Sequence, residues 1–372
     1  MNSTDAQTRS RREVHGIRWP GVLALVALDL ATLLSWMAYD DYQPRLVEHF
    51  GYGAEARTFA TLQAVILVLT PPVAGHVADR LLASGGTRLA LVNLGITLAA
   101  MAFMATSLAA SGAQHPLLSA GFPLLITLWL ISMNIFHSPA ISMLELYAPP
   151  VLLTGVAALF TLLANLVEAL GPSLTVLIDA CGASATFAGG GILIALSGLA
   201  FLRTASGTSS AVHRPDMGTD RGERSAFGRI VAMGLLLGGT GALIDDLLPP
   251  WIAAKGDLVA GLAPAVQSSL LHVIAAFAAA PFGLIGNRIG CTRLAGLGLA
   301  LSLIAGPCAW LLAGKAASTA LVLLPIAYAA AGVAALPLAF SLLPPRHTVV
   351  GVGLLFSALE VVPGIVKIAL TV

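Results

Sequence analysis

Two stretches of this sequence decide its fold: DDYQPRLVEHFG, residues 40–51, and DDLLPPWIAAKG, residues 245–256. Each places two adjacent aspartates at the end of a long apolar run, in a chain that is only 10% charged. Four positions match at a constant offset of 205 residues: Asp40 and Asp245, Asp41 and Asp246, Pro44 and Pro249, Gly51 and Gly256. The repetition indicates a duplicated unit.

A second pair of stretches supports the duplication. GHVADR, with Gly75, Asp79 and Arg80, matches GLIGNR, with Gly283, Asn287 and Arg288, at an offset of 208 residues. The drift of three residues relative to the first match falls in the intervening loop. Because both motifs recur in the same order along the chain, they predict two parallel halves of six helices each.

The composition indicates a polytopic helical membrane protein. The chain of 372 residues is 57% hydrophobic with a mean hydropathy of +0.90, whereas soluble domains are roughly 45–50% apolar. The apolar runs reach the about 20 residues that a helix needs to cross a bilayer. Eleven spans are predicted, at about 20–43, 58–78, 89–110, 119–144, 151–178, 183–203, 228–249, 262–285, 292–313, 318–342 and 349–371.

The polar residues divide the chain into four parts. Residues 1–19 form an N-terminal tail, and residues 20–203 form the first half with six helices. Residues 204–227 are rich in Gly, Ser, Thr and Arg and read as a flexible linker. Residues 228–372 form the second half, in which five helices are visible.

The distribution of basic residues predicts the orientation, because loops on the cytoplasmic side carry an excess of Lys and Arg. A cytoplasmic N-terminus puts fourteen arginines on that side and only Arg45, Arg57, Lys255 and Lys315 on the other. We therefore expect a multi-pass protein of a cell membrane, the bacterial inner membrane, with both acidic pairs at the outer face.

The two repeated motifs resemble those of the major facilitator superfamily of secondary transporters. The end of the first helix, with Pro44, Leu46, Phe50 and Gly51, is similar to the family pattern P-x-L-x-x-x-F-G. The family loop G-x-x-x-D-R-x-G-R is matched by Gly75, Asp79 and Arg80, with its basic end displaced to Arg88. The resemblance implies two six-helix halves around a central cavity. The family has twelve helices, so the last one is expected to be absent here, either natively or by truncation.

The repeated loop motif is interpreted as a cytoplasmic latch formed by Gly75, Asp79, Arg80, Gly283, Asn287 and Arg288. The glycines allow close approach between helices, as small residues do in membranes. Asp79 can accept hydrogen bonds at the N-terminus of a neighbouring helix, where negative charge is favoured. The alternative is a charged loop that only sets topology.

Polar and ionisable residues inside the spans are candidates for a substrate and proton pathway, because a charge in the bilayer costs roughly 2.5–3.5 kcal/mol on insertion scales. The candidates are Asp29, Trp36, Asn134, His137, Asn165, Glu168, Gln267, His272, Glu360 and Lys367. Glu168, just before Gly171 and Pro172, is the favoured coupling acid. Glu360 and Lys367 share a helix face and are expected to pair, and each remaining residue has a purely structural alternative.

The four aspartates of the opening stretches are expected to meet at one outer mouth. In the resembled fold the first and seventh helices lie on opposite sides of the cavity, which brings together Asp40, Asp41, Asp245 and Asp246. They would form an outer vestibule that concentrates cations, or a gate governed by repulsion between like charges. The alternative is a set of solvated interfacial caps.

The leading functional hypothesis is a proton-coupled secondary transporter that moves a small solute by alternating access. Its expected partners are the solute, protons and the bilayer, with no nucleic acid, and it is expected to act as a monomer. No cofactor or metal site is expected, and no phosphate-binding loop that would use ATP is present. Two alternatives are a transporter-like sensor or assembly factor and an intramembrane prenyltransferase-like enzyme, which would need differently spaced aspartates.

Overall fold

The described residues are almost entirely helical, with ten helices long enough to cross a membrane, or eleven spans if one bent pair of helices counts as a span. We describe it from a computed structural model over residues 16–111, 116–206, 220–255, 263–312 and 314–371. Within these ranges each of the eleven spans expected from the sequence is present. The N-terminal tail to residue 15, residues 207–219 of the linker and Gly256 of the repeat lie outside the described residues.

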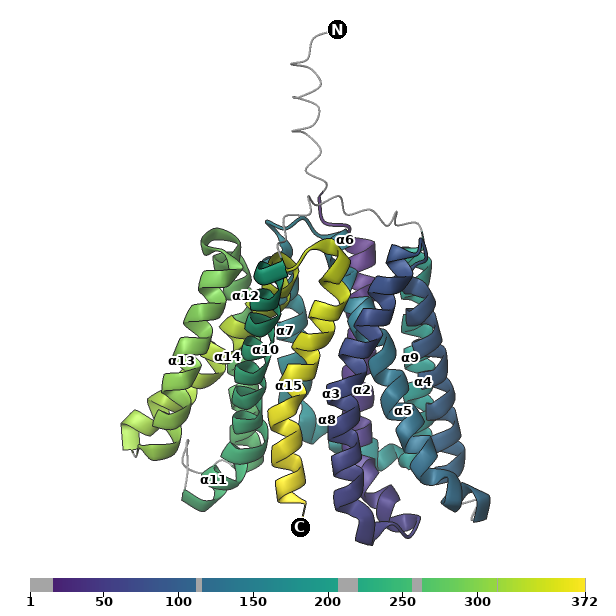
Figure 1. Cartoon of the computed structure of the whole chain (residues 1–372). Helices are drawn as coiled ribbons and strands as arrows, with labels where there is room; N and C mark the ends of the chain where they lie inside the picture. Colours follow the sequence, from purple (N-terminus) through teal and green to yellow (C-terminus); the bar gives the residue numbers. More distant parts are fainter. Residues whose placement is uncertain (1–15, 112–115, 207–219, 256–262, 313, 372) are drawn as a thin grey trace.

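The first half is a bundle with its own apolar core, drawn in purple to teal in Figure 1. It contains α2 (Trp19–His49), α3 (Ala56–Ala83), α4 (Arg88–Ala110), α5 (Pro116–Ser142), α6 (Leu144–Tyr147), α7 (Leu153–Ala169), α8 (Gly171–Cys181) and α9 (Ala183–Ala205). Large buried side chains, among them Trp129 and Phe103, fill its centre. Leucine and methionine side chains such as Met101 and Leu108 cover its outside, as expected for a surface that faces lipid.

The second half is a separate bundle that runs from green to yellow. It contains α10 (Asp220–Ala242), the π-helical turn η2 (Leu243–Leu247), α11 (Leu248–Lys255), α12 (Pro264–Ile289), α13 (Cys291–Leu311), α14 (Gly314–Leu342) and α15 (Thr348–Leu370). Two clusters of small and aliphatic side chains, built from residues such as Ala331, Val333 and Leu324, form its core. The helix α10 begins inside the segment that the sequence predicted as linker, because a helix can extend beyond the apolar run that hydropathy detects.

The helix ends define two faces. The side on which α2 begins carries Arg18, Arg80, Arg88, Arg203, Arg288, Arg293 and Arg346 and is called the basic face. The opposite side carries the aspartates of the opening stretches and is called the acidic face. Figure 1 shows the beginning of α2 on one side and the C-terminal end of α15 on the other.

The halves meet mainly along two helix pairs, α3 with α15 and α7 with α12, and also where α7 contacts α14 and α5 contacts α15. The backbones approach closely, because a Cβ atom added at Gly75 would lie 2.6 Å from the carbonyl oxygen of Val349, and one at Gly353 only 2.3 Å from that of Pro71. A Cβ atom at Gly283 would lie 2.7 Å from the Cβ atom of Ala158. Glycine is what lets the halves come together near the basic face.

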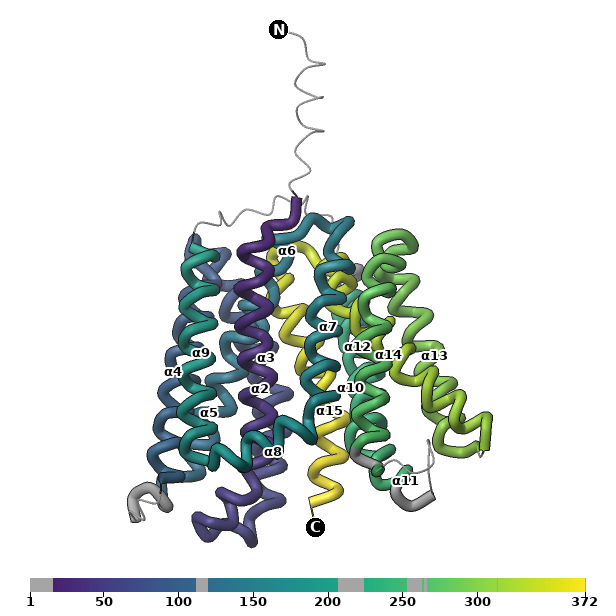
Figure 2. The backbone as a smooth tube through the Cα atoms, turned by 180° about the vertical axis from the view of Figure 1, so that it is seen from behind, coloured from purple at the N-terminus to yellow at the C-terminus, as the bar shows by residue number. Residues whose placement is uncertain are grey.

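The fifth predicted span is broken by Gly171 and Pro172. The helix α7 ends at Ala169, α8 begins at Gly171, and their axes differ by 63°. Proline has no N–H to continue the helical hydrogen bonds and its ring clashes with the preceding turn. Figure 2 shows α8 running across the end of α7 at the acidic face, so Glu168 lies just before a sharp bend.

Candidate functional site: polar groups between the two halves

Asp79 joins the two halves at the basic face. Its carboxylate accepts hydrogen bonds from the backbone N–H groups of Val349 (3.3 Å) and Val350 (2.9 Å), in the first turn of α15. The first N–H groups of a helix have no partner within the helix and carry partial positive charge, so they favour an anion. This is the hydrogen-bond geometry that the sequence predicted for Asp79. Arg80 beside it is exposed.

The second copy of the motif makes an equivalent contact between the other two helices. The Oδ1 atom of Asn287, on α12, accepts a hydrogen bond of 3.2 Å from the N–H of Gly155, in the first turn of α7. Asn287 stands where the first copy has Asp79, and an amide oxygen performs the same acceptor role without the charge. Arg288 is exposed, like Arg80. Two related contacts therefore join the halves on one face.

A buried ion pair supports the same face from within the first half. A guanidinium nitrogen of Arg88 lies 3.1 Å from Glu145 Oε1, and Arg88 also donates to the carbonyl oxygen of Ser142 at 3.2 Å. The Arg88 and Glu145 side chains are only 10% and 0% exposed. The sequence pointed to Arg88 as the displaced end of the loop motif, but Glu145 was missed. The sequence feature that could have identified Glu145 is its position as a lone acid in the apolar stretch SMLELYAPP, residues 142–150.

Lys367 forms an ion pair across the halves near the acidic face. Its Nζ atom lies 3.6 Å from Oδ2 of Asp40, with both side chains about half exposed. The sequence predicted pairing with Glu360, seven residues earlier on α15. Glu360 does interact electrostatically with Lys367, but the closest ion pair of Lys367 is the one with Asp40 of α2. Periodicity along one helix shows which residues share a face and gives no information on what the neighbouring helix presents.

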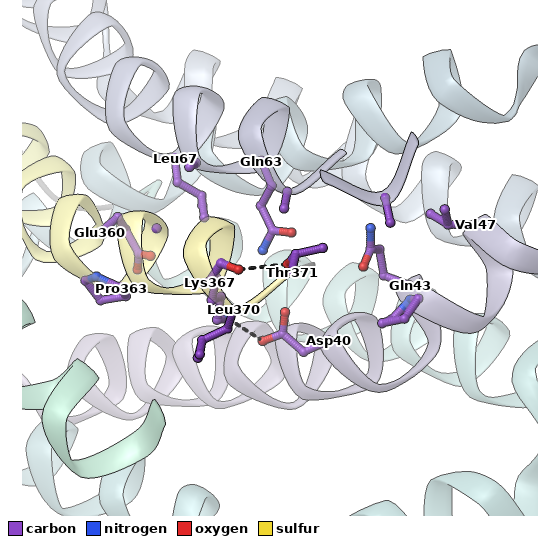
Figure 3. A pocket seen from close by; sticks show the side chains of 15 residues that line it. Asp40, Gln43, Val47, Gln63, Leu67, Glu360, Pro363, Lys367, Leu370 and Thr371 are labelled. Atoms are coloured by element: carbon purple, nitrogen blue, oxygen red, sulfur yellow. Dashed lines mark hydrogen bonds and ion pairs between the residues drawn. The ribbon is translucent and has the colours of Figure 1, made fainter. Parts of the chain in front are cut away.

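These residues border a cavity. A space of about 390 Å³ lies between α2, α3 and α15, and its lining includes Asp40, Glu360 and Lys367 together with Gln43 and Gln63. Figure 3 shows Lys367 directed toward Asp40, with Gln63 on the facing helix and Glu360 further back along α15. The cavity therefore lies where the two halves face each other, toward the acidic face.

His272 connects three helices. Its Nε2 atom lies 2.9 Å from Asp245 Oδ1 on η2, and its Nδ1 atom lies 3.4 Å from the side-chain oxygen of Asn165 on α7. Glu168, one turn after Asn165, is exposed and interacts electrostatically with both Asp245 and His272. Four of the sequence candidates thus form one polar cluster that bridges the halves.

The acidic pair of the second half lies on the π-helical turn η2. Such turns add a residue to a helical turn and occur frequently at functional sites. Asp245 faces His272, while Asp246 interacts electrostatically with Lys367 and Asp40. Sequence periodicity gave no sign of this turn, because a single inserted residue changes the helical phase only locally.

The four aspartates do not all meet at one mouth. Asp40, Asp245 and Asp246 approach the space between the halves, but Asp41 pairs with Arg45 at 3.2 Å, and Arg45 also pairs with Asp179 of α8. Successive residues of an α-helix point about 100° apart, so an adjacent pair on the regular helix α2 has to face two directions. The prediction is wrong for Asp41, which belongs to the contact between α2 and α8.

A further ionisable pair joins two helices of the first half. His137 Nε2, on α5, is 3.2 Å from Asp29 Oδ1 on α2. The imidazole also packs against Phe356 of α15, with ring centroids 4.5 Å apart. This pair therefore touches the second half through an aromatic contact.

Trp36 and Asn134 have contacts within the first half, and Gln267 is buried. Trp36 packs edge-on against Trp129, with centroids 4.9 Å apart, and is only partly buried. Asn134 donates to the carbonyl oxygen of Leu130 in its own helix at 2.8 Å. Gln267 is 2% exposed. Packing explains these positions as well as a pathway does.

Comparison with known proteins identifies the fold. No family model matches the sequence, and no curated protein matches it. Solved structures, however, match over nearly the whole chain. The human organic anion transporter MFSD10 matches with a TM-score of 0.69 at 15% identity, over 94% of this chain and 92% of that one. The fucose:proton symporter FucP of E. coli matches with a TM-score of 0.66 at 14% identity, over 93% of this chain and 90% of that one. A bacterial homologue of the iron transporter ferroportin, in an outward-facing state, matches with a TM-score of 0.65 at 16% identity, over 94% and 90%. The chain has the major facilitator fold, as its sequence motifs predicted.

Proposed function

We propose that this protein is a secondary transporter that works by alternating access and that the structure represents its state open to the acidic face. The observation that carries the proposal is the arrangement of contacts between the halves. At the basic face, the side chains of Asp79 and Asn287 accept hydrogen bonds from backbone N–H groups of the opposite half. Toward the acidic face, ionisable side chains of both halves line a cavity and remain accessible.

The distribution of contacts supports rocking of the two halves as the motion. Transporters of this kind alternate by rigid-body rocking of repeats around a central site. The contacts at the basic face are few hydrogen bonds between helix ends and glycine-mediated approaches, which can separate without unfolding either core. Most of each apolar core comes from one half, and among the described buried residues only Phe340 and Val352 join the core of the first half and Ala158 that of the second. The outward-facing ferroportin homologue provides a solved precedent for such a state in the same fold.

Protons are the coupling ion in this proposal. Glu168, Asp245 and His272 bridge the halves, and carboxylate and imidazole groups exchange protons near neutral pH when their surroundings change. Rocking would change both the separation of these groups and their exposure to water. A solute gradient could thus be linked to a proton gradient through this cluster.

The membrane orientation follows from the same charge distribution. We propose that the basic face, and the N-terminus with it, lies in the cytoplasm, because the positive-inside rule favours arginine-rich loops on that side. We propose a bacterial inner membrane as the location. The acidic face, with Asp40, Asp245 and Asp246, then faces outward.

Distances between spin labels test alternating access without knowledge of the solute. After replacement of the cysteines Cys181, Cys291 and Cys308, labels at Arg57 and Lys315 report on the acidic face, and labels at Arg203 and Arg293 report on the basic face. All four label positions are exposed and each pair spans the two halves. In nanodiscs across pH, one distance should shorten as the other lengthens. Distances that stay constant, or change together, would contradict the proposal.

Flux measurements separate a transporter from a sensor with the same fold. Proteoliposomes that enclose a pH-sensitive dye are challenged with panels of amines, carboxylates and sugars. A transporter should give protein-dependent solute uptake coupled to a pH change for one class. Rocking without any flux would favour the sensor or assembly-factor alternative.

A further inference from the structure

We propose that the cavity between α2, α3 and α15 binds a small organic ammonium ion, with Asp40 and Glu360 as its carboxylate partners and Lys367 as an internal competitor. The proposal names the ligand class of the transporter proposed above, and its role in transport rests on that function. Binding at the cavity can be tested separately.

The charge inside the cavity favours a cation. Two carboxylates, Asp40 and Glu360, face one ammonium group, that of Lys367. Outside the lining, Asp246 also acts on Glu360 and Lys367, and His137, which pairs with Asp29, acts on Glu360. A carboxylate therefore remains for which the cavity supplies no cation of its own, and a ligand with one positive charge would balance it.

The shape of the cavity favours a cation with an apolar body. Ala56, Ala60 and Ala64 lie four residues apart on one face of α3, so their small side chains form one wall. Leu67 and Val47 extend the apolar surface. A volume of about 390 Å³ lies within the range of small-molecule sites, roughly 300–1,000 Å³ with mostly apolar linings and a few polar groups.

Two amides can complete the polar end. The side chains of Gln43 and Gln63 line the cavity from α2 and α3, and Gln63 lies near Lys367 in Figure 3. Their carbonyl oxygens can accept hydrogen bonds from a protonated amine. Among the residues that the structure describes, no group of three or more His, Cys, Asp and Glu side chains is arranged to hold a metal ion. The apolar wall on α3 gives the body of an organic cation a surface to pack against, which a metal ion would leave unused.

Lys367 occupies the place that a ligand's ammonium group would take. Its Nζ atom lies 3.6 Å from Asp40, and both side chains are about half exposed to water. Ion pairs with such exposure are weak, so a ligand can displace Lys367 from Asp40 at small cost. The side chain then competes with the ligand for one carboxylate, and its removal should strengthen binding.

Three probes of similar size test the ligand class on the wild-type protein. They are 2-phenylethylamine, 2-phenylethanol and 3-phenylpropionate, which differ mainly in charge. Calorimetric titration in nanodiscs at neutral pH should show binding of the amine and none of the alcohol or the acid. Equal binding of the alcohol would overturn the proposal, because charge would then play no part.

Variants test the residues. Asp40→Asn and Glu360→Gln should each weaken amine binding by about tenfold, since a charge-assisted hydrogen bond is lost, and Lys367→Gln should tighten it. Asp179→Asn is the matched control, because Asp179 pairs with Arg45 outside the cavity. Unchanged affinity in Asp40→Asn and Glu360→Gln would overturn the assignment. Binding of 3-phenylpropionate that Lys367→Gln abolishes would reassign the cavity to anions.

The outcomes separate this inference from the proposed function. If the label distances show rocking and the amine does not bind, only the ligand class is wrong. If the amine binds and no rocking or flux occurs, the cavity is a binding site in a protein that does not transport. Size-exclusion profiles of each variant check that it is folded before its titration is interpreted.

Discussion

The carboxylate of Asp79 on α3 accepts a 2.9 Å hydrogen bond from the backbone N–H of Val350 on α15, so one half of the protein holds the first turn of a helix in the other. Asn287 repeats the contact on Gly155 with a neutral side chain. We propose that the two copies of one motif close the same face with different strengths. An anion at a helix N-terminus gains about 0.3–1 kcal/mol over a neutral group, so the Asp79 contact should be the stronger.

Exchange of the two side chains should shift the balance between states. Asp79→Asn should favour opening of the basic face by about 1 kcal/mol, about a fivefold change in population. Asn287→Asp should favour closure by a similar amount. The distance between labels at Arg203 and Arg293 measures both shifts. If the two substitutions move the populations in the same direction, or leave them unchanged, the motif is a charged loop without a conformational role.

Glycine contacts at the joined face should be sensitive to one added methyl group. A Cβ atom at Gly353 would lie 2.3 Å from the carbonyl oxygen of Pro71, a backbone atom that has little freedom to move. Gly353→Ala should therefore destabilise the closed basic face by about 1–3 kcal/mol through overpacking and favour the opposite state in label distances. At Gly296 on α13, a Cβ atom would meet nothing within 4 Å. Gly296→Ala is thus the control and should leave the distances as in the wild type.

The buried pair of Arg88 and Glu145 should show strong coupling. Removal of one charge leaves the other buried without its partner, which typically costs about 3–5 kcal/mol. Glu145→Gln and Arg88→Gln should each lower the thermal midpoint sharply, while the double variant should be more stable than the sum of the two losses predicts. Additive losses would mean that the two side chains contribute independently.

Local sequence pattern predicted the helices well, and the repeat predicted the hydrogen bonds of Asp79. Hydropathy detects apolar runs directly, and a motif that recurs at matching positions reports a contact that both halves need. The cross-helix partners were not predictable in this way. Glu145 pairs with a residue 57 positions away, and Lys367 pairs with Asp40 instead of its helix neighbour Glu360, because packing of different helices decides these contacts.

The acidic pairs show the same limit. Sequence identity predicted equivalent roles for Asp41 and Asp246, but Asp41 lies on a regular helix and Asp246 on a π-helical turn. The inserted residue in the second copy changes where the side chains point. Two copies of one sequence motif therefore place their aspartates differently in the two halves.

The charge of His272 should make the distance between the two halves at the acidic face depend on pH. Protonated His272 forms an ion pair with Asp245 at 2.9 Å, and this attraction is lost as rising pH removes the proton. His272→Gln keeps a hydrogen-bonding side chain but no titratable group, so the pH dependence of the acidic-face distance between labels at Arg57 and Lys315 should become flatter.

Glu168→Gln should abolish proton-driven transport while expression and folding remain intact, because the side chain keeps its shape and loses its titratable proton. The residue is exposed toward the same cluster, so its neutralisation leaves no buried charge uncompensated. Solute exchange without a proton gradient, measured in the same proteoliposomes, is the control and should persist. Transport that keeps its full pH dependence in Glu168→Gln would remove this residue from coupling and turn attention to other ionisable pairs between the halves, among them Asp29 with His137 and Asp40 with Lys367.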